Sequence, residues 1–298
     1  MYTITHITKD GLDYVRLKSP NGKTAANICL TQGGRLSQFI FEEVEVISEI
    51  KPETYKDNYA SSILFPFANR IKDGNYNFDG VAYNLQCNEA DKNNALHGLV
   101  YNKYFSVVDK HFTSGEATLT LGYIEDYPTT GFPFKYEIKI TYMLSSEGIK
   151  IKVDILNKDK KPFPFTLGWH PYFTSSNLTE SFMDYSSSKC FLQDHQNITT
   201  GTADFKMVMP FQVKDKKLDD AYALENNVIK FLTPQYNVII KSSSEENFLQ
   251  LYTPNDPNII AIEPMTGVSD SFNNKTGLQV LNANDSYSLE WNVMIKKV

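Results

Sequence analysis

The sequence predicts an all-β protein built as a large antiparallel β-sandwich. Apolar and polar residues alternate in several runs along the 298 residues, a pattern typical of strands with one buried face. Turn-forming residues separate these runs, and aromatic residues make up 13% of the chain, which suits closely packed strands. No segment carries a sustained apolar stripe with the helical period of 3.6 residues. We therefore expect strands to form most of the regular structure.

The clearest strands form a hairpin in the middle of the chain. In residues 134–144 every second residue is apolar, and the residues between them are mostly charged or polar. The alternation resumes in residues 149–155, after a Ser-Ser-Glu-Gly turn at 145–148. Two runs of period 2 joined by a short glycine-containing turn predict an antiparallel hairpin. Residues 287–295 repeat the alternation near the C-terminus.

The remaining segments give weaker signals. Shorter alternating runs occur at 117–124, 236–241, 248–252 and 259–262, and residues 53–62 predict at most one short helix. No shift in composition, linker or internal repeat divides the chain. We therefore expect a single domain over residues 1–298.

Composition and charge exclude several classes of protein. Lys plus Arg number 29 and Asp plus Glu 35, a net charge of −6 without a dense basic run, so we expect neither a nucleic-acid nor a membrane partner. The N-terminus lacks the apolar core of a signal peptide, and no window approaches the ~18 apolar residues of a membrane span. Three scattered cysteines, Cys29, Cys87 and Cys190, suit reduced thiols. We expect a cytoplasmic protein, either a monomer or a homodimer.

The most informative motif is Gly-Trp-His-Pro-Tyr-Phe at 168–173. Proline disfavours helix in the residue before it, so His170 is expected on extended backbone. The flanking rings of Trp169 and Tyr172 are possible walls of a site from which water is excluded. In such a site an imidazole can serve as an acid or a base near neutral pH, although a lone histidine among aromatics also occurs as an ordinary core residue.

Four other places carry residues suited to chemistry. Asn69-Arg70 follows an apolar run, and its guanidinium needs acceptors from a ligand or from a structural ion pair. At His97-Gly98, the glycine allows the backbone to approach a ligand closely. Asp219 and Asp220 are adjacent, so in an extended segment only one of them faces a given site. Glu263 ends the apolar run 259–262, where burial would raise its pKa towards a range useful for a general base.

These residues permit two different active sites. One is an acid–base pair formed by a histidine and Glu263. The other is a metal centre with His97, His170 and Glu263 as ligands. No histidine-histidine or glutamate-histidine spacing of the helical kind supports the metal centre, which leaves the acid–base pair as the better-supported hypothesis.

Taken in order, these segments resemble the aldose 1-epimerase (galactose mutarotase) family over roughly residues 10–296. The segments that carry the resemblance are Asn69-Arg70-Ile71, Gly74 to Gly80, Tyr83-Asn84-Leu85, Leu96-His97-Gly98, Gly168 to Phe173, Leu218 to Tyr222 and Glu263-Pro264. The resemblance implies a large antiparallel β-sandwich of the galactose mutarotase-like type, or supersandwich, with a sugar in an open cleft. It also implies a role in carbohydrate metabolism without a cofactor or a metal.

The resemblance implies a role for each matching residue. Glu263 is expected to be the general base that takes the proton from the C1 hydroxyl, and His170 the general acid that protonates the ring oxygen. The remaining residues are expected to bind the sugar: Arg70, His97, Asp219, Asn69 and Gln250. The acid must be protonated while the base is ionised, so the pKa of the histidine should lie above that of the glutamate, with a bell-shaped pH dependence of kcat/KM.

The expected activity is an aldose 1-epimerase that interconverts the α and β anomers of a free aldose such as galactose or glucose. One alternative is a hexose-6-phosphate 1-epimerase, which needs extra cationic residues at the rim of the cleft. A second alternative is a catalytically silent carbohydrate-binding domain on the same fold. The presence of both His170 and Glu263 argues against silent binding, since a pure binding site needs no acid–base pair.

Overall fold

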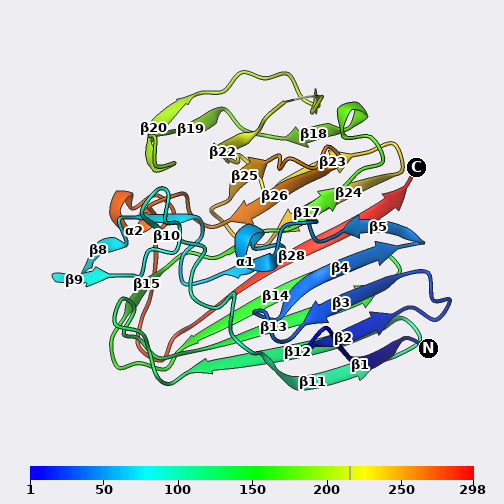
Figure 1. Ribbon diagram of the computed structural model, residues 1–298, viewed down its shortest axis with the longest axis horizontal. Coiled ribbons are helices and arrows are strands. Elements are labelled where there is room, and N and C mark those ends of the chain that lie inside the picture. Colours follow the sequence, from blue (N-terminus) through cyan, green and yellow to red (C-terminus); the bar gives the residue numbers. More distant parts are fainter. Residues whose placement is uncertain (215) are drawn as a thin grey trace.

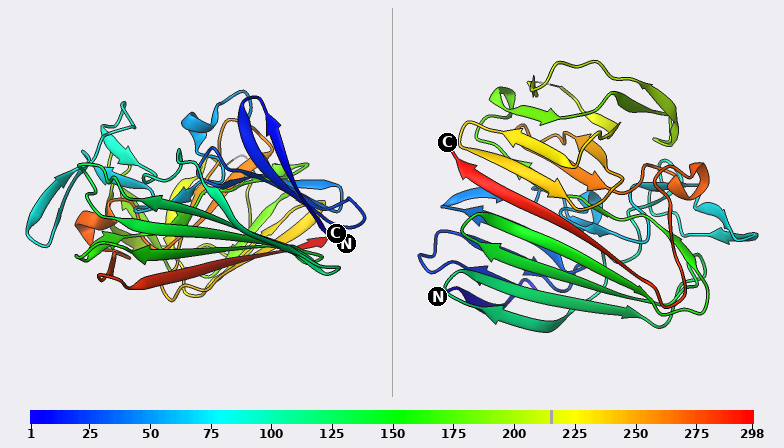
Figure 2. Two further views of the ribbon diagram at one scale, coloured as in Figure 1. Left: turned by 90° about the horizontal axis from the view of Figure 1, so that it is seen from below. Right: turned by 180° about the vertical axis from the view of Figure 1, so that it is seen from behind.

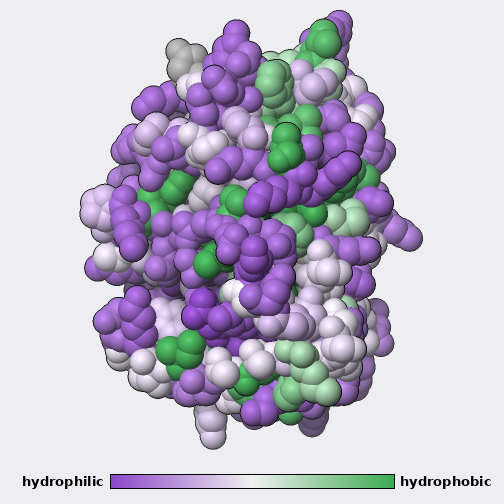
Figure 3. Space-filling model, turned by 90° about the vertical axis from the view of Figure 1, so that its right-hand side faces the viewer, coloured by the Kyte–Doolittle hydropathy of each residue, from purple (hydrophilic) through white to green (hydrophobic). Residues whose placement is uncertain are grey.

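Strands dominate the computed structural model, which describes residues 1–214 and 216–298. Two large antiparallel sheets lie face to face (Figures 1 and 2), so the predicted all-β sandwich is confirmed. Within these residues, no helix has the length and apolarity required to cross a membrane. Hydrophilic side chains cover most of the side shown in Figure 3, with hydrophobic ones in small groups.

The first large sheet runs through eleven strands, with two short strands beside its middle. Their order is β1 (Thr3–Lys9), β2 (Leu12–Lys18), β3 (Ala25–Cys29), β4 (Arg35–Phe41), β5 (Val44–Ile47), β17 (Tyr172–Thr174), β26 (Ile259–Met265), β25 (Phe248–Tyr252), β22 (Asp219–Ala223), β19 (Lys189–Gln193) and β20 (Thr199–Asp204). The strand β16 (Gly168–Trp169) pairs with β26 and with β6 (Ile63–Leu64). N-terminal and C-terminal segments therefore meet where β5, β17 and β26 adjoin.

The second large sheet contains the hairpin that the sequence predicts. Its order is β11 (Ser106–Phe112), β12 (Glu116–Glu125), β13 (Tyr136–Ser145), β14 (Gly148–Asn157), β28 (Ser286–Lys297), β24 (Tyr236–Ser242), β23 (Val228–Leu232), β18 (Phe182–Tyr185) and β21 (Phe211–Gln212). β13 and β14 pair antiparallel around the expected turn, and β28 pairs with β14. The strongest alternation in the sequence therefore marks the centre of this sheet.

Shorter elements connect and cover the two sheets. Three small pairs of strands are β7 (Arg70–Lys72) with β10 (Asn94–Leu96), β8 (Asn75–Phe78) with β9 (Val81–Asn84), and β15 (Phe163–Phe165) with β27 (Gln279–Leu281). The helices α1 (Tyr55–Asn58) and α2 (Ser271–Asn274) and the 3-10 helix η1 (Leu178–Glu180) are each a single turn. Helix α1 falls inside the segment 53–62, where a short helix is expected.

The main apolar core lies between the two large sheets. It combines inward-facing side chains such as Ile28 and Phe39 of the first sheet with Leu119, Ile140 and Val153 of the second. Each of these side chains is fully buried. Alternation along the strands thus builds the core from one face of each sheet, and it leaves the other face of the first sheet free to carry polar groups.

Strand β26 shows how this division positions a functional group. Ile260 and Ile262 belong to the core between the sheets, whereas Ile259 and Ala261 pack in a separate cluster on the other face. Glu263 continues the second series, because side chains two residues apart share a face. The carboxylate therefore points away from the main core, under the segments that cover the first sheet.

Candidate active site

A cleft of about 260 Å³ lies on the outer face of the first sheet, where β17, β26, β25 and β22 adjoin. Helix α1 and the segments around β7 and β10 cover this part of the sheet (Figure 1). All seven site residues predicted from the sequence line the cleft: Asn69, Arg70, His97, His170, Asp219, Gln250 and Glu263. The fold thus brings together residues that lie up to 194 positions apart in the chain (263 − 69).

Glu263 lies on the floor of the cleft, with only 2% of its surface exposed. Its neighbour across the strand pair is Gln250 of β25, so the two side chains share the face that lines the cleft. Burial raises the pKa of Glu263 well above its usual value, the charge of Asp219 adds to this effect, and Arg70 opposes it. Its Oε2 atom is buried without a hydrogen-bond partner among the described residues. A carboxyl in this state is available to exchange a proton with a ligand.

His170 lies between β16 and β17 on non-helical backbone, as the following proline predicts. Its amide donates to the carbonyl of Ser62 (3.0 Å), and its carbonyl accepts from the amide of Ser61 (2.8 Å). These two bonds fix the backbone that carries the ring. The Nε2 atom lies 3.5 Å from Oε1 of Glu263, which places the predicted acid and base side by side.

Burial raises the pKa of Glu263, as expected from its sequence position, but it reverses the expected order of the two pKa values. It lowers the pKa of His170 to about 4 and raises that of Glu263 well above 4.5. The expected order, with the pKa of the histidine above that of the glutamate, is therefore wrong. The physical reason is desolvation, which penalises the charged form of both groups. Burial therefore favours a protonated carboxyl at Glu263 and a neutral imidazole at His170.

His97 and Asn69 meet at the entrance to the strand pair β7–β10. The amide of His97 donates to the carbonyl of Asn69 (2.8 Å), and both residues adopt positive φ angles, 61° and 59°. The ring of His97 lies edge-on to that of His170, with centroids 4.9 Å apart. Burial and the neighbouring His170 lower the pKa of His97 well below its usual value. His97 therefore faces the cleft as a neutral imidazole.

Gly98 has a different role from the one that the sequence suggests. A Cβ atom at this position would lie 2.3 Å from the carbonyl oxygen of Phe65, and φ is +76°. The close approach is thus to the protein's own backbone rather than to a ligand. The glycine lets the chain turn directly after His97 and so holds that ring over the cleft.

Arg70 is held by a carboxylate that the sequence analysis does not identify. Its Nη2 and Nε atoms contact Glu89 at 2.7 Å and 2.9 Å, and both residues are largely buried. The Arg70 hydrogen bonds and charge lower the pKa of Glu89 against the opposing effect of burial. Nη1 of Arg70 also donates to Oδ1 of Asn69 (3.1 Å). Of the alternatives left open for Arg70, a structural ion pair is therefore present, and it lies within the cleft.

A series of hydrogen bonds links two amide side chains and one carboxylate that line the cleft. Asn69 Nδ2 lies 3.4 Å from Gln250 Oε1, and Gln250 Nε2 donates to Asp219 Oδ1 (2.9 Å). Asn197 Nδ2 donates to the other carboxylate oxygen of Asp219 (3.0 Å). Asp219 lines the cleft and Asp220 does not, as expected of adjacent residues on a strand. These hydrogen bonds fix the orientations of Gln250 on β25 and Asp219 on β22.

The side chains of Trp169 and Tyr172, which flank His170 in the sequence, lie in different environments. Tyr172 lines the cleft, and its ring centroid lies 5.0 Å from that of His170. Trp169 is fully buried and faces Trp291 of the second sheet, with centroids 6.1 Å apart, so the expectation that it forms a wall of the site is wrong. The reason is alternation, since residues 169 and 172 point to opposite faces of the first sheet.

Several lining residues were not predicted from the sequence. Glu89 and Asn197 come from connecting segments outside the recognised motifs, and Tyr59 lies beside helix α1. Tyr59 packs edge-on against His97, with centroids 4.9 Å apart. No local pattern marks these residues, so only their spatial proximity to Arg70, Asp219 and His97 identifies them.

The alternative metal centre finds no support in the side-chain arrangement. His97, His170 and Glu263 line one cleft, but across residues 1–214 and 216–298 no group of three His, Cys, Asp or Glu side chains could hold a metal ion. His170 instead directs Nε2 at the carboxylate, and the ring of His97 meets His170 edge-on. The arrangement suits proton transfer between two neighbouring groups.

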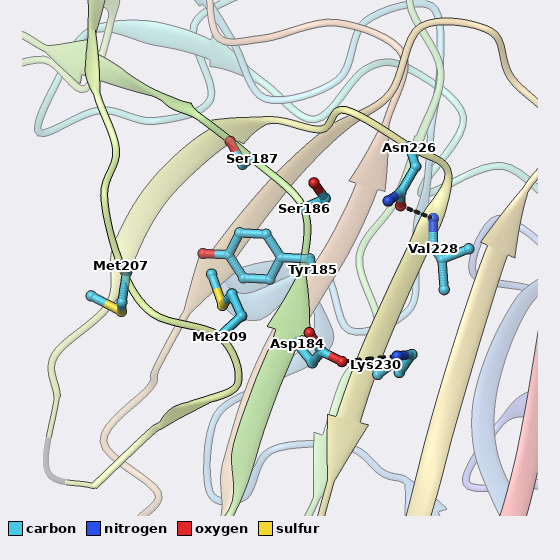
Figure 4. A pocket seen from close by; sticks show the side chains of 9 residues that line it. All are labelled: Asp184, Tyr185, Ser186, Ser187, Met207, Met209, Asn226, Val228 and Lys230. Atoms are coloured by element: carbon cyan, nitrogen blue, oxygen red, sulfur yellow. Dashed lines mark hydrogen bonds and ion pairs between the residues drawn. The ribbon is translucent and has the colours of Figure 1, made fainter.

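A second hollow, of about 360 Å³, lies beside strands β18 and β23 (Figure 4). Its lining includes the ion pair between Asp184 and Lys230 (2.9 Å) and the ring of Tyr185. Both charges are already paired, and the described residues that line it include no histidine. This hollow therefore lacks the acid–base pair that distinguishes the cleft.

Comparisons with known proteins agree with the geometry. The family model for aldose 1-epimerase matches residues 14–293. The uncharacterized protein YihR of Escherichia coli K12 is 25% identical over 277 residues, 89% of this chain and 88% of YihR. A galactose mutarotase-like protein from Clostridium acetobutylicum has a TM-score of 0.89 at 20% identity, covering 100% of this chain and 99% of that one. The galactose 1-epimerase of Lactobacillus acidophilus has a TM-score of 0.83 at 15% identity, with the same coverage. With its fold and most of its length matched, the chain belongs to the aldose 1-epimerase family.

Proposed function

We propose that this protein is an aldose 1-epimerase that interconverts the α and β anomers of a free aldose such as galactose or glucose. The observation that carries the proposal is the contact between His170 Nε2 and Glu263 Oε1, 3.5 Å apart at the bottom of a polar cleft. Opening of a sugar ring requires one proton to leave O1 and another to reach O5, and a neighbouring acid and base are the minimum apparatus for that exchange.

The proposed step balances its protons within the pair. Glu263, ionised, takes the proton from the C1 hydroxyl while His170, protonated, gives a proton to the ring oxygen. The C1–O5 bond breaks and C1 becomes an aldehyde. Rotation about the C1–C2 bond then presents the other face of the aldehyde. Ring closure reverses both transfers, so the carboxyl returns its proton to O1 and the neutral imidazole takes one from O5.

The two protonation states of the pair correspond to the two halves of this cycle. The imidazolium–carboxylate form of the pair exchanges protons with the closed sugar. The neutral imidazole and the carboxylic acid are the form that lies beside the open-chain aldehyde. Burial favours the neutral form, as the shifts in pKa at both residues indicate. Burial in the cleft thus favours the neutral form that follows ring opening. Transfer of one proton from Glu263 to His170 restores the imidazolium–carboxylate form.

We propose that the remaining predicted residues hold the sugar hydroxyls. Arg70, His97, Asp219 and Gln250 line the cleft together with the pair. Asn69 contacts both Arg70 and Gln250. We infer that this set orients the sugar so that O1 faces Glu263 and O5 faces His170.

The charge of the cleft favours an uncharged sugar over a phosphorylated one. Besides Glu263, whose pKa is raised, the described lining residues include the carboxylates Glu53, Asp57, Glu89 and Asp219 against two cations, Arg70 and Lys92. Arg70 is already neutralised by Glu89. A dianionic phosphate would meet more negative than positive charge, contrary to what a hexose-6-phosphate 1-epimerase needs.

Polarimetry tests the proposal directly. Freshly dissolved α-glucose, α-galactose and glucose 6-phosphate are followed with and without protein, and the rate in buffer is subtracted. We expect faster mutarotation of at least one free aldose, with loss of the effect in Glu263→Gln. Acceleration of the phosphorylated sugar alone would select the hexose-6-phosphate activity. Binding of sugars without acceleration across the panel would leave a silent binding domain.

A further inference from the structure

A second feature of the molecule is an arginine without a partner. The chain has three arginines, Arg16, Arg35 and Arg70. Arg35 pairs with Glu49, and Arg70 pairs with Glu89. Arg16, by contrast, forms no salt bridge with any carboxylate of residues 1–214 and 216–298. Its Nε atom is buried and has no hydrogen-bond partner within that part of the chain. A buried N–H without an acceptor costs free energy unless a ligand or water supplies one.

The surroundings of Arg16 provide a second unpartnered atom. Arg16 of β2 lies opposite Asn27 of β3, and Asn27 lies opposite Gln38 of β4. Asn27 Nδ2 donates to Gln38 Oε1 (2.8 Å), and Gln38 Nε2 donates to Glu45 Oε1 (2.5 Å). Since a carboxylate only accepts, Glu45 fixes the orientation of both amides. Asn27 Oδ1 is left buried without a hydrogen-bond partner among the described residues, on the strand position that pairs with Arg16.

These two atoms specify the chemistry of a ligand. Arg16 Nε requires an acceptor, and Asn27 Oδ1 requires a donor. A hydroxyl group satisfies both at once, because its oxygen accepts and its O–H donates. A carboxylate or phosphate oxygen would satisfy the arginine but would face the Asn27 oxygen as a second acceptor. The pair therefore selects a hydroxylated ligand over an anion.

The space beside this pair is large enough for a sugar. A groove of about 630 Å³ runs over β2 to β5 and reaches the ends of β17 and β26. Besides the polar row, its lining includes the ring of Tyr14, the hydroxyl groups of Ser48 and Thr174, and the amide of Asn258. An aromatic ring next to amides and hydroxyls suits a ligand with apolar C–H faces and a hydroxyl edge.

The groove is separate from the cleft although both lie on the same face of the first sheet. Thr174 and Ile259 line the groove, whereas Tyr172 and Glu263, on the same two strands, line the cleft. The segment that follows β5 contributes to both sites, because Ser48 and Lys51 line the groove whereas Glu53 and Tyr59 line the cleft. Among residues 1–214 and 216–298, no residue lines both sites.

We propose that this groove is a second carbohydrate-binding site, with Arg16 and Asn27 sharing one hydroxyl of the ligand. The proposal is independent of the epimerase activity, because it concerns residues outside the cleft. Methyl glycosides separate the two ideas experimentally. Their anomeric oxygen is blocked, so they cannot undergo ring opening, yet they present the hydroxyl groups that the groove would recognise.

The test combines a soaked crystal structure with binding in solution. Crystals of the full chain are soaked with methyl β-galactoside and methyl β-glucoside, and binding of the same compounds is measured by saturation-transfer NMR. We expect the sugar on Arg16 and Asn27. In solution, Arg16→Met should weaken binding at the groove about tenfold or more, which corresponds to loss of a charge-assisted hydrogen bond. Lys18→Met removes a charge from the same strand outside the groove and should leave binding unchanged.

A second variant distinguishes loss of the binding site from misfolding of Arg16→Met. In Asn27→Asp, a carboxylate next to Arg16 would pair with the guanidinium and close the site, so binding should again be lost while the melting temperature is kept. Three results would overturn the proposal. They are a groove that holds only water, sugar binding that is unchanged in both variants, or inorganic sulfate that binds Arg16 more tightly than either glycoside does.

Discussion

Two pairs of oppositely ionisable side chains lie in the same cleft, and they differ in how they are held. Arg70 and Glu89 meet through several short contacts, down to 2.7 Å, and the pKa of Glu89 is lowered. His170 and Glu263 have a single contact of 3.5 Å, and burial drives both towards the neutral form. The contacts of the first pair stabilise its charges, and we propose that the second pair exchanges a proton.

The difference arises from the number of hydrogen bonds that each carboxylate receives. Glu89 accepts from two nitrogens of Arg70 and from Asn94 Nδ2 (2.8 Å), which offsets the cost of burying its charge. Glu263 has an Oε2 atom with no partner in the described residues, so desolvation dominates. An incomplete set of hydrogen bonds thus leaves room for a sugar hydroxyl to complete it.

Removal of either member of the exchanging pair should have the largest effect. His170→Asn and Glu263→Gln each lose one proton carrier, so we expect kcat for mutarotation to fall by ~10²–10⁴-fold. The measurement is polarimetry with the aldose that the wild-type protein accelerates most. His111→Asn changes an exposed histidine of β11 and serves as the matched control. Wild-type kcat in either cleft variant would remove that residue from the proposed mechanism.

Removal of the charge-holding carboxylate should affect binding more than chemistry. Glu89→Gln leaves the Arg70 guanidinium partly buried without its partner and free to change orientation, so we expect KM to rise about tenfold with a smaller change in kcat. Glu43→Gln breaks an exposed pair with Lys23 and should leave both constants unchanged. Partial recovery of KM in Glu89→Asp would support a positioning role. An equal loss of kcat with no change in KM would contradict it.

The pH dependence should report the pair as a unit that carries one proton. As pH falls through about 4, His170 takes up a second proton beside the neutral Glu263 carboxyl, no base remains, and kcat/KM declines. As pH rises through the raised pKa of Glu263, the pair loses its only proton and the acid is missing. The acid limb therefore belongs to His170 and the alkaline limb to Glu263, the reverse of the assignment expected from unperturbed residues. An acid limb centred near 6.5 would show that His170 is not desolvated.

The smallest expected effect is on stability. A carboxyl whose folded pKa is raised contributes stability below its unfolded pKa, and that contribution is lost as pH rises through the folded value. Glu263→Gln has no proton to lose. At alkaline pH we therefore expect its Tm to exceed that of the wild type by ~2–4 °C, about 1 kcal/mol for a chain of this size. Equal Tm values at all pH values would indicate that Glu263 does not pay a desolvation cost.

Patterns within single strands predicted several structural features of this protein. The alternation around residues 145–148 predicted the β13–β14 hairpin, and Pro171 predicted the non-helical backbone at His170. The position of Glu263 at the end of an apolar run predicted its burial. Each of these properties depends on residues that are adjacent in the chain, so the sequence contains the necessary information.

Properties that depend on contacts between distant segments were not predictable in the same way. Glu89 lies in no recognisable motif, and only its proximity to Arg70 gives it a role. The pKa values of His170 and Glu263 depend on how completely other segments cover them. The Arg16 groove requires the register of β2 against β3, which no local pattern specifies.

The most direct test of the shared-proton account is a double-mutant cycle on the exchanging pair. Mutarotation is measured by polarimetry for wild type, His170→Asn, Glu263→Gln and the double variant. If the two residues pass one proton through a common step, the double variant should be no slower than the slower single variant. If the two losses in log kcat simply add, the residues act independently, and the account of a single proton-exchanging pair is contradicted.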